Sequence, residues 1–287
     1  MRVDINTRDI ETVRRECDRI YRSTFVDADP QFLPWACGWF RRIFDGQYED
    51  YLPIDTPYHD REHTMQGLLC LVRLLHGRHR AKAEPGVPRR TFELGVLAIL
   101  LHDTGYLKHD TDIEGTGAKY TLIHVDRSKD FAAAFMHKQG YTPSDIKAVR
   151  NMIQCTAMNA KLKDIPFSTS SERVVGYSLA TSDLLGQMSA RDYVDRLPQL
   201  YGEFKESCEY YGRRADRLYY ESAEALIANT CDFWECYVKP KLENGCDGTY
   251  RFLNDPYPDG ENVYLTRIEA NVEKTQSARL DFKAKSG

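Results

Sequence analysis

The segment 92-FELGVLAILLHDTGY-106 decides the fold class. From Phe92 to Leu101 it is apolar on nearly every side of a helix, which predicts a helix buried in the centre of a domain. His102 and Asp103 follow at its inner end, and Thr104-Gly105 then breaks it. Burying an imidazole beside a carboxylate is costly unless something pairs them. A divalent cation is one suitable partner, and a hydrogen-bonded His-Asp pair at the helix end is the other interpretation.

The rest of the chain also has helical periodicity, and the alternation typical of strands is scarce. The expected helices are 7–24, 31–47, 61–77, 90–103, 119–138, 143–157, 171–187, 189–208, 214–239 and 262–283. We therefore expect an all-α protein with one helical domain over residues 1–240. Residues 241–287 form a loop, over about 243–260, and a C-terminal helix for packing or oligomerisation. Its apolar positions Leu265, Ile268 and Val272 would dock it on the body or on a second subunit.

The composition is that of a soluble globular protein, with 287 residues, 42% hydrophobic and 29% charged. The net charge of −4 argues against a general binder of nucleic-acid polymers or of anionic membranes. The longest apolar run, Gly95 to Leu101, is far shorter than the ~20 residues that span a bilayer. The charged N-terminal segment has no apolar signal region, and the eight cysteines include no Cys-x-x-Cys pair. These features predict a cytoplasmic protein with reduced thiols.

A pair of histidines stands in the segment 56-TPYHDREHTMQGLL-69. His59 and His63 are four residues apart, so one helical turn places both on the same side. His63 also leads an apolar stripe and should point inward, whereas His59 follows Pro57 at the helix start, where side chains are more exposed. This arrangement suits one inward ligand and one accessible acid or base. An ordinary pair of surface and half-buried histidines is the alternative.

Two further polar residues are expected to face the core. Asp183 continues the apolar face of Val175 and Leu179 at spacing i, i+4, i+8, and a lone inward Asp is rare unless a charge or a metal pairs it. His124 shares a helical face with Phe131, which also turns it inward. The Asp183 pattern is an argument for a buried cation that does not depend on the histidines.

The candidate residues follow one another over about residues 55–190 in the order His59, His63, His102, Asp103, His124 and Asp183. This order resembles the HD-domain superfamily of metal-dependent phosphohydrolases. The resemblance implies a multi-helix bundle of the HD-domain type, with residues 55–190 as its motif core. It also implies that one metal is held by His63, His102, Asp103 and Asp183.

The phrase YHDREH is similar to the His-Asn-x-x-His signature of class I cyclic-nucleotide phosphodiesterases, with Asp60 in place of the Asn. In that family the first His gives a proton to the leaving oxygen, and this resemblance implies that role for His59. The catalytic residues implied in this way are His59 and Asp103. The expectation that the substrate is a phosphodiester and not a phosphomonoester rests on this phrase alone.

Two departures from the superfamily patterns bear on which branch of the HD-domain superfamily the chain resembles. Tyr106 stands where the cyclic-di-nucleotide branch has a Lys after the doublet. The two-metal and oxygenase branches usually place two histidines between the doublet and the last Asp. His124 could be one of them, but Cys155 stands where the other is expected. This disfavours a fully His-ligated di-iron site and leaves open a second metal held by His124, Asp103 and waters.

The expected activity is the metal-dependent hydrolysis of a small phosphoester, a nucleotide or cyclic nucleotide, by a metal-activated water. Mixed N/O ligation suits Mn, Fe, Zn, Co or Mg, one or two ions per chain. Four nearby cations are candidates for substrate binding, each also interpretable as a solvated surface charge: Arg61, Lys108, Lys119 and Arg127. A di-iron oxygenase of the HD type and a non-catalytic metal-bound helical module are the alternatives. A homo-oligomer is compatible with each of these functions.

Overall fold

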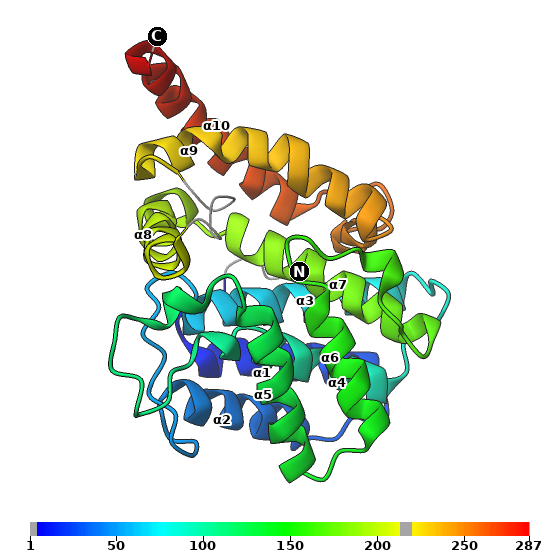
Figure 1. Ribbon diagram of the computed structural model, residues 1–287. Coiled ribbons are helices and arrows are strands. Elements are labelled where there is room, and N and C mark those ends of the chain that lie inside the picture. Colours follow the sequence, from blue (N-terminus) through cyan, green and yellow to red (C-terminus); the bar gives the residue numbers. More distant parts are fainter. Residues whose placement is uncertain (1–4, 213–219, 287) are drawn as a thin grey trace.

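The computed structural model describes residues 5–212 and 220–286, and this part of the chain is all-helical, with no β-strand (Figure 1). Its α-helices are α1 Ile10–Thr24, α2 Phe32–Phe44, α3 Arg61–Arg80, α4 Arg89–Leu101, α5 His124–Lys138, α6 Pro143–Gln154, α7 Ser170–Met188, α8 Tyr193–Tyr211, α9 Ala223–Phe233 and α10 Val263–Ser286. They pack into a multi-helix bundle, which confirms the predicted fold class. Each predicted helix overlaps one of these, although the first residues of the predicted 214–239 helix lie outside the described residues.

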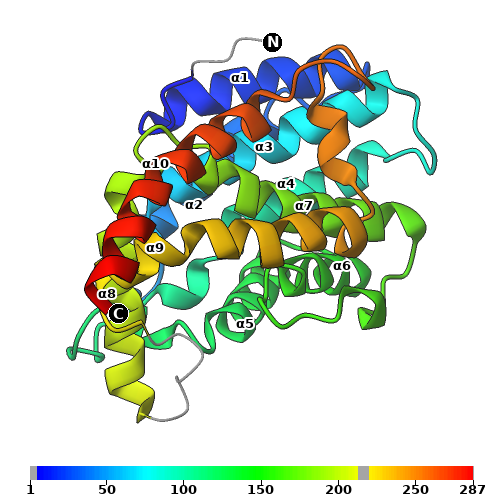
Figure 2. The ribbon, with the colours of Figure 1, turned by 90° about the horizontal axis from the view of Figure 1, so that it is seen from above.

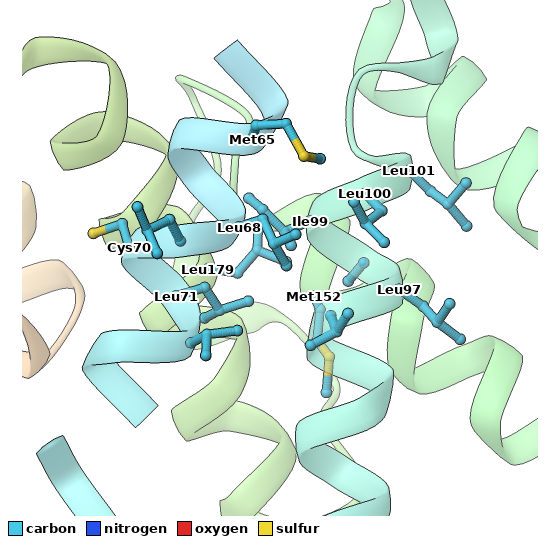
Figure 3. Packing of buried hydrophobic residues seen from close by; sticks show 14 of the residues in the cluster. Met65, Leu68, Cys70, Leu71, Leu97, Ile99, Leu100, Leu101, Met152 and Leu179 are labelled. Atoms are coloured by element: carbon cyan, nitrogen blue, oxygen red, sulfur yellow. The ribbon is translucent and has the colours of Figure 1, made fainter. Parts of the chain in front are cut away.

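Helix α4 lies at the centre, and every residue from Phe92 to Leu101 is buried, as its apolar character on all sides predicted. Helices α3 and α7 pack against it and against each other. In Figure 3, Leu68 of α3, Ile99 of α4 and Leu179 of α7 come together, and all three are fully buried. Burying one such side chain contributes about 1.5–3 kcal/mol, so this contact stabilises the frame that carries the candidate site.

The remaining helices cover this centre from several sides. Helix α1 packs along α3, α2 contacts α1 and α4, and α5 and α6 pair with each other against α4. Helices α9 and α10 lie side by side above α7 in Figure 1, and Figure 2 shows both crossing the top of the bundle. No helix among the described residues is both long and apolar enough to cross a membrane.

The C-terminal part differs from the predicted loop over 243–260. After α9, π-helical turns at Trp234–Val238 and Lys241–Gly245 continue the helical path, and a 3₁₀ helix covers Thr249–Leu253. Leu242 and Leu253 are buried in the main core, which explains why this polar-looking stretch is ordered into helical turns. In α10, Ile268 and Val272 belong to the same core, so this helix docks on the body of its own chain. The domain boundary at residue 240 stays a prediction.

Helix α5 begins at His124, five residues later than the predicted residue 119. A separate 3₁₀ helix, η2 Gly117–Tyr120, stands in front of it. The side chain of Thr116 caps η2 by accepting the Ala118 N–H at 3.2 Å. The chain then turns, so the side chains of η2 and of α5 do not share one helical face.

Gly105 permits the close approach of the two segments that carry His102 and His124. A Cβ atom at this position would lie 1.9 Å from the backbone oxygen of His124, and backbone cannot move aside as a side-chain tip can. We expect Gly105→Ala to lower the free energy of unfolding by about 1–3 kcal/mol, measured by urea denaturation. Gly38→Ala is the matched control, because nothing lies within 4 Å of its Cβ position in α2. The control should be neutral or stabilising by up to ~1 kcal/mol, and equal losses in both variants would contradict this interpretation.

Candidate metal centre

The first turn of α3 and the middle of α7 bring His63 and Asp183 together. Asp60 caps α3 by accepting the backbone N–H of His63 at 2.9 Å, which fixes where the helix starts. A Cβ atom on Gly186 would lie 2.9 Å from the backbone of Gln66, so this glycine lets α3 and α7 approach closely one turn beyond the two residues. The side chains of His63 and Asp183 therefore point into the same space.

The doublet enters this space from the end of α4. His102 is the C-cap residue of α4, and its Nδ1 lies 2.8 Å from the backbone oxygen of Ile99. A carbonyl oxygen only accepts hydrogen bonds, so Nδ1 carries the proton and donates it. Nε2 is thereby left to face Asp103 and Asp183, as in a histidine that is oriented for ligation.

Four side chains from three helices and the turn after α4 converge on one point. Nε2 of His63 lies 3.2 Å from Oδ2 of Asp103 and 3.2 Å from Oδ1 of Asp183. Nε2 of His102 lies 3.2 Å and 3.5 Å from the same two oxygens. Three of the residues are only 2% exposed, and Asp183 retains 14% of its side-chain surface. These distances bring together the four residues that the sequence predicted as one ligand set.

The pKa shifts at this centre follow from burial opposed by opposite charges. Burial lowers the pKa of His63, but the facing carboxylates of Asp103 and Asp183 outweigh it and raise the pKa to about 10. The pKa of His102 is raised in the same way. Burial raises the pKa of both carboxyl groups, but the two imidazoles lower each of them below the ordinary value. The two carboxylates therefore favour the protonated form of the two imidazoles when no cation is bound.

A divalent cation fits this donor set because two largely buried carboxylates face two imidazole nitrogens, and its charge would balance the two carboxylates. Nε2 of His102 and Oδ2 of Asp103 are buried without a hydrogen-bond partner among the described residues, which is costly for polar atoms. Ligand atoms of His63, His102 and Asp183 lie within 4.8 Å of one another. The cluster could therefore hold a metal ion, and its N/O donors suit several divalent metals.

A second set of groups lies on the other side of Asp103. Nε2 of His124 lies 4.0 Å from Oδ1 of Asp103, and Nδ1 of His124 donates to the Thr121 oxygen at 2.6 Å. Burial lowers the pKa of His124 and outweighs the opposing charge of Asp103, so this imidazole is neutral. His59, His63 and Asp103 also present ligand atoms within 4.8 Å of one another. Asp103 thus borders both sets.

His59 is held from behind by a buried carboxylate that the sequence analysis did not find. Oε2 of Glu203, on α8, lies 2.5 Å from Nδ1 of His59, and Oε1 accepts the backbone N–H groups of Tyr58 at 2.6 Å and His59 at 3.2 Å. The Glu203 side chain is 1% exposed, whereas His59 keeps 15% of its surface. Ser207 stands one helical turn after Glu203, so this face of α8 is not an apolar stripe. The sequence pattern therefore gave no signal that Glu203 is buried.

Two aromatic rings and an amide support these groups. The Tyr106 ring stacks on the imidazoles of both His59 and His124, with centroid distances of 4.7 Å and 4.6 Å. Gln187 donates to the Asp183 backbone oxygen at 3.1 Å and to its Oδ1 at 3.4 Å, and it accepts the Tyr58 hydroxyl at 2.9 Å. These contacts fix the orientation of the histidines and of Asp183 before any ligand binds.

The four cations that the sequence suggested for substrate binding are each engaged elsewhere. Their partners are Asp45 for Arg61, Asp55 and the Gly115 oxygen for Lys108, Asp112 and the Glu114 oxygen for Lys119, and the Gly105 and Leu107 oxygens for Arg127. Lys108 and Lys119 are buried, so their interpretation as solvated surface charges is wrong. They hold the loop between the doublet and His124. A role in substrate binding stays a prediction for all four.

Cys155 lies in a satellite apolar cluster with Leu162, Tyr177 and Cys246, and it belongs to neither ligand group. Burial raises the pKa of its thiol, which keeps it protonated and a poor ligand. The position where a second-metal histidine was expected therefore offers no donor to this centre among the described residues.

Fold and site together define an all-helical protein with a buried His/Asp cluster that could hold a metal ion. Residues 108–254 match the family model described as Npun_R2479-like, and this match covers just over half of the chain. The chain belongs to the Npun_R2479-like family. The matched segment contains His124, Asp183 and Glu203, while His63 and the doublet precede it. No curated protein matches the chain.

Proposed function

We propose that this protein is a metal-dependent phosphohydrolase of the HD-domain type. The substrate is a small phosphoester, a nucleotide or a cyclic nucleotide. The observation that carries the proposal is the juxtaposition of a buried four-residue N/O ligand set with one accessible histidine, His59, oriented by Glu203. A metal-bound scaffold has no use for an accessible histidine held in this way.

In this proposal His63, His102, Asp103 and Asp183 hold the metal. A divalent cation supplies Lewis-acid chemistry, because it neutralises charge on phosphoryl oxygens and makes water a stronger nucleophile near neutral pH. His124, with the second oxygen of Asp103, is the donor pair available for a second ion. The identity of the ion, and whether one or two bind, depend on this pair.

His59 is the general acid of the proposed reaction. Its Nδ1–H donates to the carboxylate of Glu203, so Nε2 is the atom that can hold a proton for the leaving oxygen. The carboxylate of Glu203 fixes the orientation of the ring, so that Nε2 keeps one direction toward the leaving oxygen. The ring centroids of His59 and His63 are 5.2 Å apart, which places the acid beside the ligand set. The stacked Tyr106 ring keeps water from the far side of His59 and holds its plane.

Metal removal tests the proposal directly. The purified protein is analysed for bound metals and then assayed for phosphate or phosphomonoester release from cyclic nucleotides, linear nucleotides and bis(p-nitrophenyl) phosphate. We expect a chelator to lower turnover by at least about 10²-fold, and Mn²⁺, Fe²⁺, Co²⁺ or Zn²⁺ to restore it. Absence of hydrolysis with every ester and metal would contradict the proposal. Iron-dependent oxygen consumption instead would favour the oxygenase alternative.

A further inference from the structure

A small cavity lies at the opposite end of α3 from the metal centre, ~22 Å along the helix at 1.5 Å per residue. Its volume is about 210 Å³, and it is bounded by the ends of α1 and α3, the loop over 82–87 and the start of α4. Its apolar walls are Phe25, Leu75, Val87 and Phe92. The rings of Phe25 and Phe92 meet edge to face at 5.4 Å, and both line the cavity.

The cationic group of this cavity is Arg78. The residue is only 4% exposed, and its guanidinium donates one hydrogen bond, to the Ala83 oxygen at 2.8 Å. It also lies over the Phe252 ring, 5.6 Å from the centroid. Among the described residues no carboxylate forms an ion pair with it. Burial lowers the pKa of Arg78, which expresses the cost of a buried charge without a counter-ion.

The acid of the cavity, Glu84, raises the pKa of Arg78 through its charge but forms no ion pair with it in the described part of the chain. Glu84 lines the same cavity, but it is exposed, and its Oε2 accepts the backbone N–H of Gly86 at 2.8 Å. The other charged or titratable groups of the lining are Lys82 and His79, which are exposed and mark the side open to solvent. The cavity therefore combines an unbalanced buried cation with apolar walls and an opening.

We propose that this cavity binds a small carboxylate that carries one flat apolar group, with the carboxylate paired to Arg78. A guanidinium presents its donors as a planar fork that matches a carboxylate in two parallel hydrogen bonds. The Phe25, Phe92 and Val87 side chains cover the apolar part. The volume admits one ring, and it excludes ligands as large as a nucleotide.

A purely structural role for Arg78 makes a different prediction. Arg78 stands in the last turn of α3, where a cation complements the negative end of the helix dipole, and its hydrogen bond fastens the loop at Ala83. Such a role needs no ligand and does not distinguish an anion from its neutral analogue. The ligand-binding role and the structural role are therefore distinguished by whether the native protein binds an anion but not the neutral analogue of that anion.

The test uses benzoate and its neutral analogue benzamide, titrated into the full chain by calorimetry. We expect benzoate to bind at least about 10-fold more tightly than benzamide, and Arg78→Gln to weaken benzoate by about 10-fold to 100-fold. Arg80→Gln is the matched control, because Arg80 stands two residues on in the same turn with 62% of its side chain exposed. The control should bind benzoate like the native protein.

A second variant keeps the test decisive where Arg78→Gln does not fold. Val87→Phe enlarges a half-buried wall residue without touching the guanidinium and should block benzoate by filling the cavity. Equal binding of benzoate and benzamide, no binding of benzoate, or unchanged binding in Val87→Phe would each overturn the proposal.

Discussion

Replacing Asp183 by Asn is expected to remove bound metal from the purified protein while leaving the helical fold in place. The carboxylate lies 3.2 Å from Nε2 of His63 and 3.5 Å from Nε2 of His102, so it is central to the proposed ligand set. An amide keeps the shape but loses the charge that a divalent cation needs. The metal content, measured by elemental analysis, should fall from at least about one ion per chain to below ~0.1.

The thermal behaviour provides a second measurement of the same loss. A metal present at 100 times its dissociation constant stabilises the native protein by about 2.7 kcal/mol, and Asp183→Asn should lose this stabilisation. Asp130→Asn is the matched control, since that carboxylate is 75% exposed and its one ion pair within the described ranges is with Arg150. The control should retain metal. Full metal content in Asp183→Asn would show that Asp183 is not a ligand.

Asp103→Ala should have the larger effect on the fold. Asp103 is the carboxylate that borders His63, His102 and His124, and all three imidazoles are largely buried. Its removal leaves the buried imidazoles of His63 and His102 facing Asp183 alone, and breaking such a buried network costs about 3–5 kcal/mol. This is why Asp183→Asn, rather than Asp103→Ala, is the variant that isolates metal binding.

The burial of each proposed ligand could be predicted because each carries a local signal in the sequence, whereas their assignment to one metal came from the resemblance to the HD-domain superfamily. His102 and Asp103 end a helix that is apolar on all sides, and Asp183 interrupts an apolar stripe. A polar residue in an apolar pattern can be recognised without knowing what lies opposite it. The same reasoning predicted the fold class, since helical periodicity is a local property of the chain.

The residues that the sequence missed depend on contacts between distant segments. Glu203 is buried because α8 packs against the segment that precedes α3, at Tyr58 and His59, and nothing near Glu203 in the sequence indicates this. Lys108 and Lys119 looked like surface charges. In the structure Lys108 pairs with the Asp55 carboxylate, and Lys119 pairs with the Asp112 carboxylate and the Glu114 backbone oxygen. Pairing of this kind is tertiary, so neither composition nor periodicity could predict it.

Replacing His59 by Ala is expected to leave metal binding intact and to lower turnover of an alkyl phosphoester by about 10²–10⁴-fold. His59 is anchored by Glu203 and 15% exposed, whereas the four proposed ligands converge without it. The loss should shrink for a p-nitrophenyl ester, because a good leaving group needs no proton. The comparison of kcat between the two esters, at matched metal content, measures this.

Two further variants are compared with His59→Ala: Glu203→Gln, which changes the partner of His59, and His137→Ala, which is the control. Glu203→Gln keeps an acceptor for the backbone N–H groups but removes the charge behind His59, so it should reproduce part of the leaving-group dependence. His137, exposed on α5, should tolerate replacement without a change in either ester. If His59→Ala loses its metal, His59 is a ligand, as its place beside His63 and Asp103 permits. If it slows both esters equally, His59 positions the substrate and another group protonates the leaving oxygen.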